Sequence, residues 1–317
     1  MSRYILSRLV GLVPVLFFIS LITFLSVAFI PGNAAMVIAG DTATKKDLEA
    51  ISKRLELDLP LHIRYVRWLG RTLTGDLGAS LLTKQQVISD IARALPVTLE
   101  LALLGTLFGA MIAFPIGIYA ATHQGSWVDQ SVMGVLLLGI SIPTYALSII
   151  LILLFSVNLK VLPASGFTPF VIDPIQNLKQ MVLPVTVVAL FQGAILARYV
   201  RSGMLEVLGQ DYVRTARSKG LGENRVILSH AMRNMLIPVI TFTGLQFGAL
   251  LSGLVITEEI FALPGIGRLA LNSLFNRDFP VVQGVVLFVA VSVVLVNLGV
   301  DVLYSFLDPR IRCGTNE

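Results

Sequence analysis

The residues that could do covalent or metal chemistry are few in this sequence and stand apart from one another. Its three histidines, His62, His123 and His230, fall in different polar segments, without the spacing of a metal site. The one cysteine, Cys313, can form no internal disulfide. Neither a phosphate-binding G-x-x-x-x-G-K-[ST] loop nor a G-x-S-x-G nucleophile motif occurs. The sequence therefore predicts no catalytic residue, no metal site and no cofactor bound by this chain.

Carboxylates lie at the ends of long apolar stretches rather than at their centres: Glu100, Glu258, Glu259, Asp278 and Asp301. A carrier driven by a proton or sodium gradient usually has an ionisable group near the middle of the membrane. This distribution argues against ion coupling and leaves ATP-independent secondary transport as a remote alternative. A membrane enzyme is also remote, because the apolar stretches contain no paired carboxylates and no nucleophile constellation.

Three uncharged polar residues lie inside apolar stretches: Gln192, Gln246 and Asn297. A polar side chain in hydrocarbon needs a hydrogen-bond partner, and a neighbouring helix is the usual source of one. We treat these residues as candidates for the transport pathway or for interhelical hydrogen bonds, and we favour the second role.

The polar segment 198–233 is the candidate site for receiving energy from another protein. It carries seven basic and three acidic residues. Two helical patterns, Leu208 to Lys219 and Glu223 to Arg233, are joined by Gly220-Leu221-Gly222. A short amphipathic helix in such a place either contacts a cytosolic partner or rests on anionic lipid headgroups. The pattern alone leaves both readings open.

One face of the first of these helices carries Tyr212, Val213 and Ala216. If this helix packs into a groove on a partner, Ala216 must be small for close approach. Gly220 follows the helix and is expected to take a left-handed conformation, which costs other residues about 1–2 kcal/mol.

The elements that position these residues are predicted to be membrane-spanning helices. A hydrocarbon core about 30 Å thick needs roughly 20 helical residues. About six stretches qualify: Leu9–Ile30, one within Leu101–Val128 that ends near Thr122, Gln130–Leu159 with Pro143 interrupting it, Gln180–Ala197 as the shortest, Asn234–Thr257, and Phe279–Val300 running on to about Tyr304. The predicted fold class is an all-α integral membrane protein.

Composition supports this fold class. Of 317 residues, 55% are hydrophobic and 14% are charged, whereas soluble domains carry about 25% charged residues. Arg3 and Arg8 precede the first apolar stretch, which is about twice as long as the apolar region of a signal peptide. We therefore expect a retained helix there. The net charge of +5 is attributed to basic loops on the cytoplasmic side, so a nucleic-acid partner is not expected.

The basic residues also predict an orientation. The segments that lie inside if the N-terminus is inside (1–8, 122–130, 198–233 and 305–317) are rich in arginine and lysine, whereas the short loops 158–180 and 258–278 carry only Lys160, Lys179, Arg268 and Arg277. Segment 31–95 holds nine basic residues, but loops of that length cross the membrane largely regardless of charge. We expect both termini to be cytoplasmic.

The long segment 31–95 is predicted to contain two amphipathic helices. Thr44-Lys45-Lys46-Asp47 is a capping-box pattern ahead of an apolar helical face. After Pro60, apolar residues recur every four positions from Leu61 until Gly75 ends the helix. These helices either form a lid that packs on the other spans or offer a docking surface to an external partner.

A family resemblance enters at segment 211–221. Asp211-Tyr212-Val213-Arg214-Thr215-Ala216-Arg217-Ser218-Lys219-Gly220-Leu221 resembles the EAA motif of ABC-importer permeases, which docks into the ATPase subunit. Arg214-Thr215-Ala216 stand where the family has E-A-A, Gly220 stands at the family's glycine, and His230 begins the segment in place of I-x-L-P. Only the last alanine and the glycine match the general pattern. That departure is typical of the dipeptide, oligopeptide and nickel permeases.

Further segments resemble that branch along nearly the whole chain. They are Gly75-Asp76-Leu77-Gly78-Ala79-Ser80, Leu95-Pro96-Val97-Thr98-Leu99-Glu100-Leu101, Glu258-Glu259-Ile260-Phe261-Ala262-Leu263-Pro264-Gly265-Ile266-Gly267-Arg268, Arg277-Asp278-Phe279-Pro280-Val281-Val282-Gln283-Gly284 and Asp308-Pro309-Arg310. Their order and spacing together make the resemblance specific.

The resemblance implies a type I ABC importer in the inner membrane of a bacterium. Its permease pair forms the pathway, two cytoplasmic ATPases bind ATP and Mg²⁺, and an external binding protein delivers the substrate. This chain is similar to the first of the two permeases. The implied coupling residues are Tyr212, Arg214, Thr215, Ala216, Gly220, Leu221 and His230.

The implied organisation has three parts. Residues 1–94 would form the N-terminal helix with its periplasmic loop, 95–304 the permease core, and 305–317 a cytoplasmic tail. The expected function is uptake of dipeptides, oligopeptides or a comparable small solute, and a nickel or metal-complex importer of the same family is the alternative. A purely structural scaffold would not need the EAA-like loop.

The predicted orientation can be tested with single cysteines at Ser52 and Ser218 in a Cys313→Ser background. Because 31–95 should lie outside and 198–233 inside, an impermeant thiol reagent should label the first site and spare the second. The measurement is labelling in intact cells with a permeabilised outer membrane. Labelling at Ser218 alone would reverse the orientation.

Overall fold

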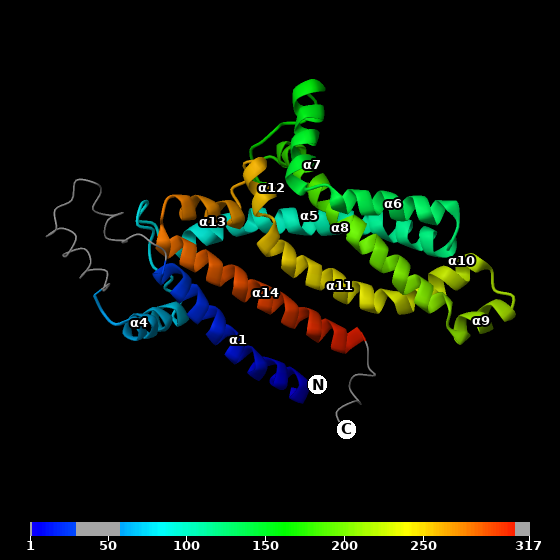
Figure 1. The fold of residues 1–317 in the computed structure, drawn as a ribbon, viewed down its shortest axis with the longest axis horizontal. Helices are drawn as coiled ribbons and strands as arrows, with labels where there is room; N and C mark the ends of the chain where they lie inside the picture. The colour runs from blue at the N-terminus through cyan, green and yellow to red at the C-terminus, as the bar shows by residue number, and fades with distance from the viewer. Residues whose placement is uncertain (1, 30–57, 308–317) are drawn as a thin grey trace. The chain divides into compact units, whose positions relative to one another are not determined.

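The computed structural model describes residues 2–29 and 58–307, which are mainly helical (Figure 1). The elements are α1 Ser2–Ala28, α4 Leu61–Leu73, α5 Val87–Thr122, α6 Trp127–Ser141, α7 Thr144–Leu151, the π-helix η1 Ile152–Asn158, α8 Pro174–Leu208, α9 Asp211–Ser218, α10 Glu223–Arg225, the π-helix η2 Val226–Ala231, α11 Met232–Gly253, α12 Val255–Ile260, α13 Ile266–Phe275 and α14 Phe279–Leu307. In these ranges the β pairing is an isolated bridge between Ala79 and Gln86. The all-α prediction is confirmed.

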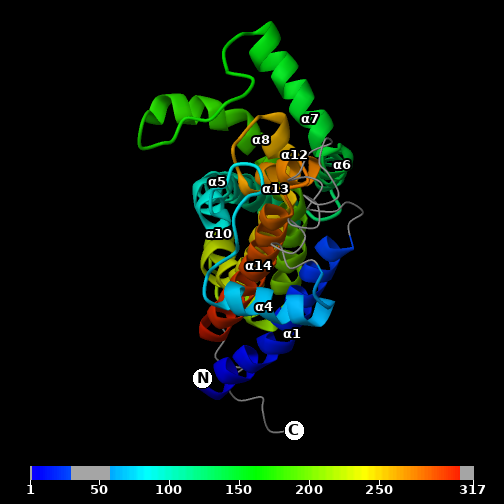
Figure 2. The same cartoon turned by 90° about the vertical axis from the view of Figure 1, so that its left-hand side faces the viewer.

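By length and composition, the described residues contain five helices that could cross a membrane, or six if a bent pair counts as one span. The bent pair joins α6 to α7 and η1, with an angle of 93° between the two parts. Ile142 and Pro143 separate them, as the sequence predicted for an interruption at Pro143. Figure 2 shows α7 leaving the direction of α6.

The fourth span is longer than the sequence analysis predicted. We expected Gln180–Ala197 to be the shortest, but α8 extends over 35 residues from Pro174 to Leu208. We placed the C-terminal end of this span before Arg198 because of that residue's charge. The helix continues past Arg198, and Val200 and Met204 are fully buried against other elements. Packing within the protein, and not lipid, stabilises these last turns.

Two other predicted boundaries are also wrong. The second span begins at Val87, well before Leu101. The helical pattern from Glu223 runs through η2 into α11 without a break, so the fifth span and the second loop helix are one element of 31 residues, Glu223–Gly253.

The described residues fall into two compact units. The smaller unit comprises 2–29, 58–98 and 264–294, and the larger unit comprises 99–263 and 295–307. The boundaries 94/95 and 304/305 suggested by the resemblance stay a prediction.

In the smaller unit, α4 is the predicted helix after Pro60, and it packs on α1. The hydroxyls of Ser20 and Tyr65 are 2.8 Å apart, and the rings of Phe24 and Trp68 lie 5.7 Å apart between centroids. The predicted capping box at Thr44 lies outside the described residues, as do Asp308-Pro309-Arg310 and Cys313.

A buried carboxylate fixes the loop after α4 in this unit. Asp278 accepts hydrogen bonds from the Ser80 hydroxyl and from the Leu81 N–H, the latter at 3.0 Å. Ser80 in turn accepts from the N–H groups of Leu82 and Thr83. The loop and the start of α14 are therefore held together in spite of their separation in sequence.

In the larger unit, glycines bring α5 and α8 close together. A Cβ added at Gly109 would lie 3.2 Å from the Gly193 nitrogen, and one added at Gly117 would lie 2.6 Å from the Ala197 carbonyl oxygen. Small residues allow such contacts between helices that share a lipid solvent. Gly139 of α6, in contrast, has nothing within 4 Å of an added Cβ.

This packing predicts that Gly117→Ala destabilises the protein. The new methyl group would meet backbone and the Val200 Cβ at 2.8 Å, so the helices must separate, at a cost of roughly 1–3 kcal/mol. The measurement is the melting temperature of the purified protein. Gly134→Ala is the matched control, because nothing lies within 4 Å of a Cβ there. Equal melting temperatures for the two variants would contradict the packing.

Candidate functional site

The candidate coupling segment is a short helix between two long ones. α8 ends at Leu208, Gly209 and Gln210 form a turn, and α9 follows over eight residues from Asp211 to Ser218. The expected single helix from Leu208 to Lys219 is therefore interrupted at its start. Figure 1 shows α9 beside the ends of α8 and α10.

One face of α9 is buried against its own chain. Val213, Ala216 and Val226 form a small apolar cluster, with Val207, Leu208 and Leu221 packed on it. Val213 and Val226 are fully buried, and Ala216 is 6% exposed. Since these side chains come from α8, α9 and η2, the cluster holds α9 to the ends of both long helices.

The burial of Ala216 corrects one expectation. We expected Ala216 to be small so that a partner could approach it closely, but its side chain faces Val213 and Val226 of this chain. A larger residue would therefore disturb the packing of α9 itself. The small size of Ala216 is therefore no evidence for a groove on a partner.

Gly220 has φ of +79°, the left-handed conformation that was expected. Its N–H donates to the Arg217 carbonyl at 2.9 Å, and the preceding Lys219 N–H donates to Thr215 at 3.1 Å. Gly220 thus ends α9 and turns the chain toward α10.

Two polar interactions brace α9 against the start of the next long helix. The Arg217 guanidinium donates to both Glu223 carboxylate oxygens, at 2.6 and 3.1 Å. The same hydrogen bonds raise the pKa of Arg217 above its usual value. The Asn234 amide donates to the Tyr212 hydroxyl at 2.8 Å and to the His230 carbonyl at 3.3 Å.

The opposite face of α9 points away from the cluster. Arg214 and Asp211 have side chains 74% and 98% exposed, and Thr215 and Lys219 are exposed beside them. Of the other residues named from the sequence, Leu221 and His230 are half-buried. The structure therefore divides the predicted coupling residues into a packing set and an outward set.

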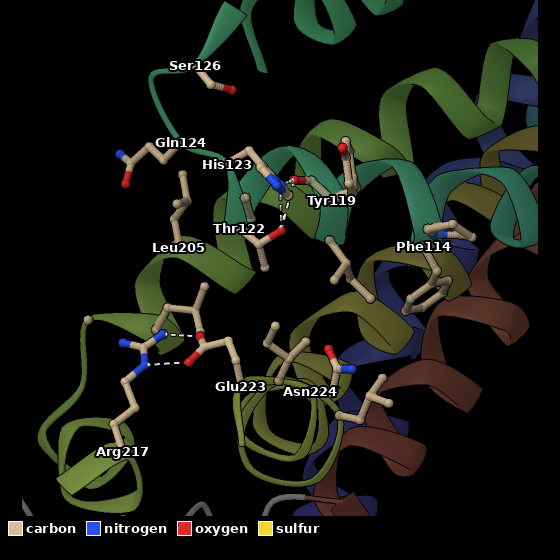
Figure 3. A pocket seen from close by; sticks show the side chains of 17 residues that line it. Phe114, Tyr119, Thr122, His123, Gln124, Ser126, Leu205, Arg217, Glu223 and Asn224 are labelled. Atoms are coloured by element: carbon tan, nitrogen blue, oxygen red, sulfur yellow. Dashed lines mark hydrogen bonds and ion pairs between the residues drawn. The ribbon is translucent and has the colours of Figure 1, made fainter. Parts of the chain in front are cut away.

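A cleft of about 1260 Å³ opens beside this segment (Figure 3). Its lining comes from the end of α5, the turn before α6, the end of α8, and the α9–α10 region; Phe114, Tyr119, His123, Leu205, Arg217 and Glu223 are among them. The His123 Nδ1 lies 3.0 Å from the Tyr119 carbonyl oxygen, to which it can donate a hydrogen bond when it carries the proton. Sequence reasoning missed this cleft, because its walls are far apart along the chain.

The polar residues inside the spans lie in two places. The Gln246 amide of α11 donates to the Gln192 carbonyl oxygen of α8 at 3.3 Å, next to a cavity of about 10 Å³ lined by Thr106, Leu196 and Thr243. Asn297 of α14 lies elsewhere, near Gly248 of α11. The interhelical hydrogen bond that we favoured is present for the glutamine pair, and the pathway role stays a prediction.

An ion pair between α6 and α8 was not found from the sequence. Arg201 donates to both carboxylate oxygens of Asp129, at 2.6 and 2.7 Å, and the two side chains are 22% and 5% exposed. Asp129 also accepts from the Gly125 N–H at 3.0 Å, so it organises the turn before α6. The only signals for this ion pair in the sequence were an aspartate at the start of one apolar stretch and an arginine after the end of another.

Among the described residues, no three His, Cys, Asp or Glu side chains lie close enough to share a metal ion. What remains is a multi-span helical protein with a braced, outward-facing helix between two spans. These features define a polytopic helical protein with an exposed short helix between two long ones.

Comparisons with known proteins give the family. Residues 113–312 match the family described as binding-protein-dependent transport system inner membrane component, and residues 1–102 match its N-terminal companion. The chain belongs to the family of binding-protein-dependent transport system inner membrane components. It is a multi-pass membrane permease of a bacterial ABC transporter, and not an enzyme.

Relatives cover almost the full chain. A Brucella abortus protein named as a peptide transport system permease is 44% identical over 98% of this chain and 99% of its own length. The glutathione transport system permease protein GsiC of Escherichia coli is 38% identical with the same coverage of both chains. The ABC permease family implies partnership with other ABC importer subunits.

The fold is also similar to a solved structure. A chain of the methionine ABC transporter MetNI, in an inward-facing conformation, superposes with a TM-score of 0.59 at 15% identity, over 69% of this chain and 96% of that chain. The predicted type I importer permease fold is confirmed.

The Arg201–Asp129 pair predicts an asymmetric response to mutation. Arg201→Met leaves a buried carboxylate without its cation and should destabilise the protein by up to about 3–5 kcal/mol. Adding Asp129→Asn removes the stranded charge and should restore most of the loss. The measurement is the melting temperature of the three proteins in one detergent. A double variant as unstable as Arg201→Met would show that the pair has no such role.

Proposed function

We propose that this permease, paired with a second homologous permease subunit, forms a pathway through which peptides enter the bacterial cytoplasm. The support for peptides is the set of relatives named for peptide and glutathione transport that match over 98% of the chain. Dipeptides and oligopeptides, glutathione-like peptides included, are the proposed substrate class.

The energy is proposed to come from ATP bound with Mg²⁺ in two cytoplasmic ATPase subunits. The chain itself has no phosphate-binding loop in its sequence. An external substrate-binding protein would deliver the peptide at the opposite side of the membrane. Both termini and the 198–233 segment would lie in the cytoplasm, in contact with membrane lipid at their edges, as the distribution of basic residues indicates.

The observation that carries the coupling proposal is the two-sided character of α9. Its inner face is fixed to α8 and η2 by a buried cluster, and its outer face presents Arg214, Thr215 and Lys219. A force applied to the outer face is therefore transmitted to the ends of two membrane-spanning helices. In this account Gly220, Tyr212 and His230 hold the geometry, and Arg214 with Thr215 contacts the ATPase.

The alternative is that α9 rests on lipid headgroups and contacts no ATPase, and this alternative requires an apolar face on α9 that is free to enter the membrane. A helix that lies on headgroups buries an apolar face in the membrane and turns its cations outward along the edge. Here the apolar face of α9 is already covered by the protein's own side chains. Little apolar surface is left on α9 to enter a bilayer.

Charge changes on the outer face should therefore uncouple the transporter without unfolding it. Arg214→Glu and Thr215→Glu each alter an exposed side chain, and we expect peptide uptake to fall roughly ten-fold or more, which equals about 1.4 kcal/mol of coupling. Transport-stimulated ATP hydrolysis of the reconstituted complex should fall with it. The protein's melting temperature should be unchanged.

Two further variants make this test specific. Arg71→Glu reverses an exposed charge on α4 and should leave uptake normal. Ala216→Asp places a carboxylate in the buried cluster, so it should lower both stability and uptake. Normal uptake in Arg214→Glu and Thr215→Glu would remove α9 as the contact with the ATPase.

A further inference from the structure

A hydroxyl group near the middle of α5 is buried without a hydrogen-bond partner. The Thr106 Oγ1 pairs with no other group among the described residues. Three other threonines in spans of the larger unit, Thr186, Thr241 and Thr243, donate to the carbonyl four residues earlier in their own helices. Thr106 does not use that acceptor, so its hydroxyl requires a partner outside its own helix.

Thr106 lines a small cavity that three spans share. Gln192 of α8 and Gln246 of α11 face it, together with Leu196 and Thr243. The Gln246 amide donates to the Gln192 carbonyl oxygen at 3.3 Å, which is longer than the typical length of about 3 Å. Each amide group carries two donors and one acceptor. One long hydrogen bond therefore leaves other polar groups of both amides to be paired.

Lipid cannot pair with these groups. Thr106, Gln192 and Gln246 lie in stretches without charge, at 101–122, 180–197 and 234–257, and each stretch belongs to a helix long and apolar enough to cross a membrane. Hydrocarbon offers no hydrogen-bond partner, so a polar group at this depth must be paired within the protein.

The size of the cavity decides what can occupy it. Its volume of about 10 Å³ is about that of one water molecule, and a peptide or a lipid chain is far larger. A metal ion would need several oxygen ligands and is usually held by carboxylates, but no Asp or Glu lines this cavity. A buried water typically makes about three hydrogen bonds to polar groups that are otherwise unpaired.

We propose that one water molecule is bound in this cavity and bridges Thr106, Gln192 and Gln246. The water completes the hydrogen bonding between α5, α8 and α11 at membrane depth. α8 and the continuous element Glu223–Gly253 also hold α9 at their ends. The water site therefore fixes the spacing of the two long helices to which α9 is attached.

The test is radiolytic footprinting of the full-length protein in lipid nanodiscs, read by mass spectrometry. X-rays convert water into hydroxyl radicals that oxidise neighbouring side chains, and a scavenger removes the radicals formed in bulk solvent. Leu196 lines the cavity and is 5% exposed. We expect oxidation of Leu196 that survives the scavenger and is lost in Thr106→Val. Leu183 of the same helix is equally buried but does not line the cavity, so it should stay unmodified.

Three outcomes of the footprinting overturn the proposal. Oxidation of Leu196 no greater than that of Leu183 would show that no water is bound. Oxidation that the scavenger abolishes would show that bulk solvent reaches the cavity. Equal oxidation of Leu196 in Thr106→Val and in the unmodified protein would show that the water does not depend on this hydroxyl.

The melting temperature of Thr106→Val gives an independent readout, because its sign depends on the water. Valine keeps the shape of threonine without the hydroxyl. Where a water pairs with that hydroxyl, the substitution removes a buried hydrogen bond and should lower the melting temperature by about 2–4 °C. In a dry cavity it would remove an unpaired polar group, so the melting temperature would stay the same or rise.

Thr241→Val is the matched control. The Thr241 hydroxyl donates to the Ile237 carbonyl of its own helix and does not line the cavity. That carbonyl belongs to the backbone ladder of the helix, so losing this hydroxyl should change the melting temperature little. A melting temperature of Thr106→Val equal to or above that of the unmodified protein would contradict the bound water.

Discussion

Hydrocarbon offers the polypeptide backbone no hydrogen-bond partner, and the rest of this structure depends on that constraint. Each span must satisfy its own N–H and C=O groups, so the described residues form long helices joined by short segments. Helices of this kind behave as stiff rods. A short helix fixed to the ends of two rods, as α9 is to α8 and η2, can therefore move both. The site that we propose for communication with other subunits therefore depends on the solvent as much as on the sequence.

The same constraint explains the position of the polar interactions within the larger unit. α8 takes part in two of them: Gln192 accepts from Gln246 of α11, and Arg201 pairs with Asp129 of α6. The uncharged pair lies within the spans and the ion pair lies near their end, where desolvation costs less. Together with the close contact of α5 at Gly109, they make α8 the helix that connects its neighbours.

Sequence reasoning found that the spans are helices, because charge-free stretches of membrane length leave few alternatives. The predicted count of about six agrees with the described residues if the bent pair is one span. The same reasoning also found the helix after Pro60 and the left-handed Gly220, where a single residue type carries the signal. Boundaries failed where tertiary packing replaced lipid: α8 continues past Arg198 because Val200 and Met204 are buried by protein.

The candidate site shows the same division. The segment 211–221 could be named from its pattern, but which face of α9 is covered could not, since Val226 lies ten residues beyond Ala216 and on another element. The Arg201–Asp129 pair and the cleft beside Glu223 depend on residues far apart in the chain. The periodicity of apolar residues within one segment does not reveal contacts between distant segments.

The central claim is that the outer face of α9 contacts the ATPase directly. Thr215→Cys, in a Cys313→Ser background, should form a crosslink with an ATPase subunit when the assembled complex is treated with a short bis-maleimide. That crosslink should stop peptide uptake, whereas single-ended labelling with a small monofunctional maleimide should be less inhibitory. A Thr215→Cys protein that reacts with the reagent yet never crosslinks to the ATPase, while uptake continues, would contradict the account.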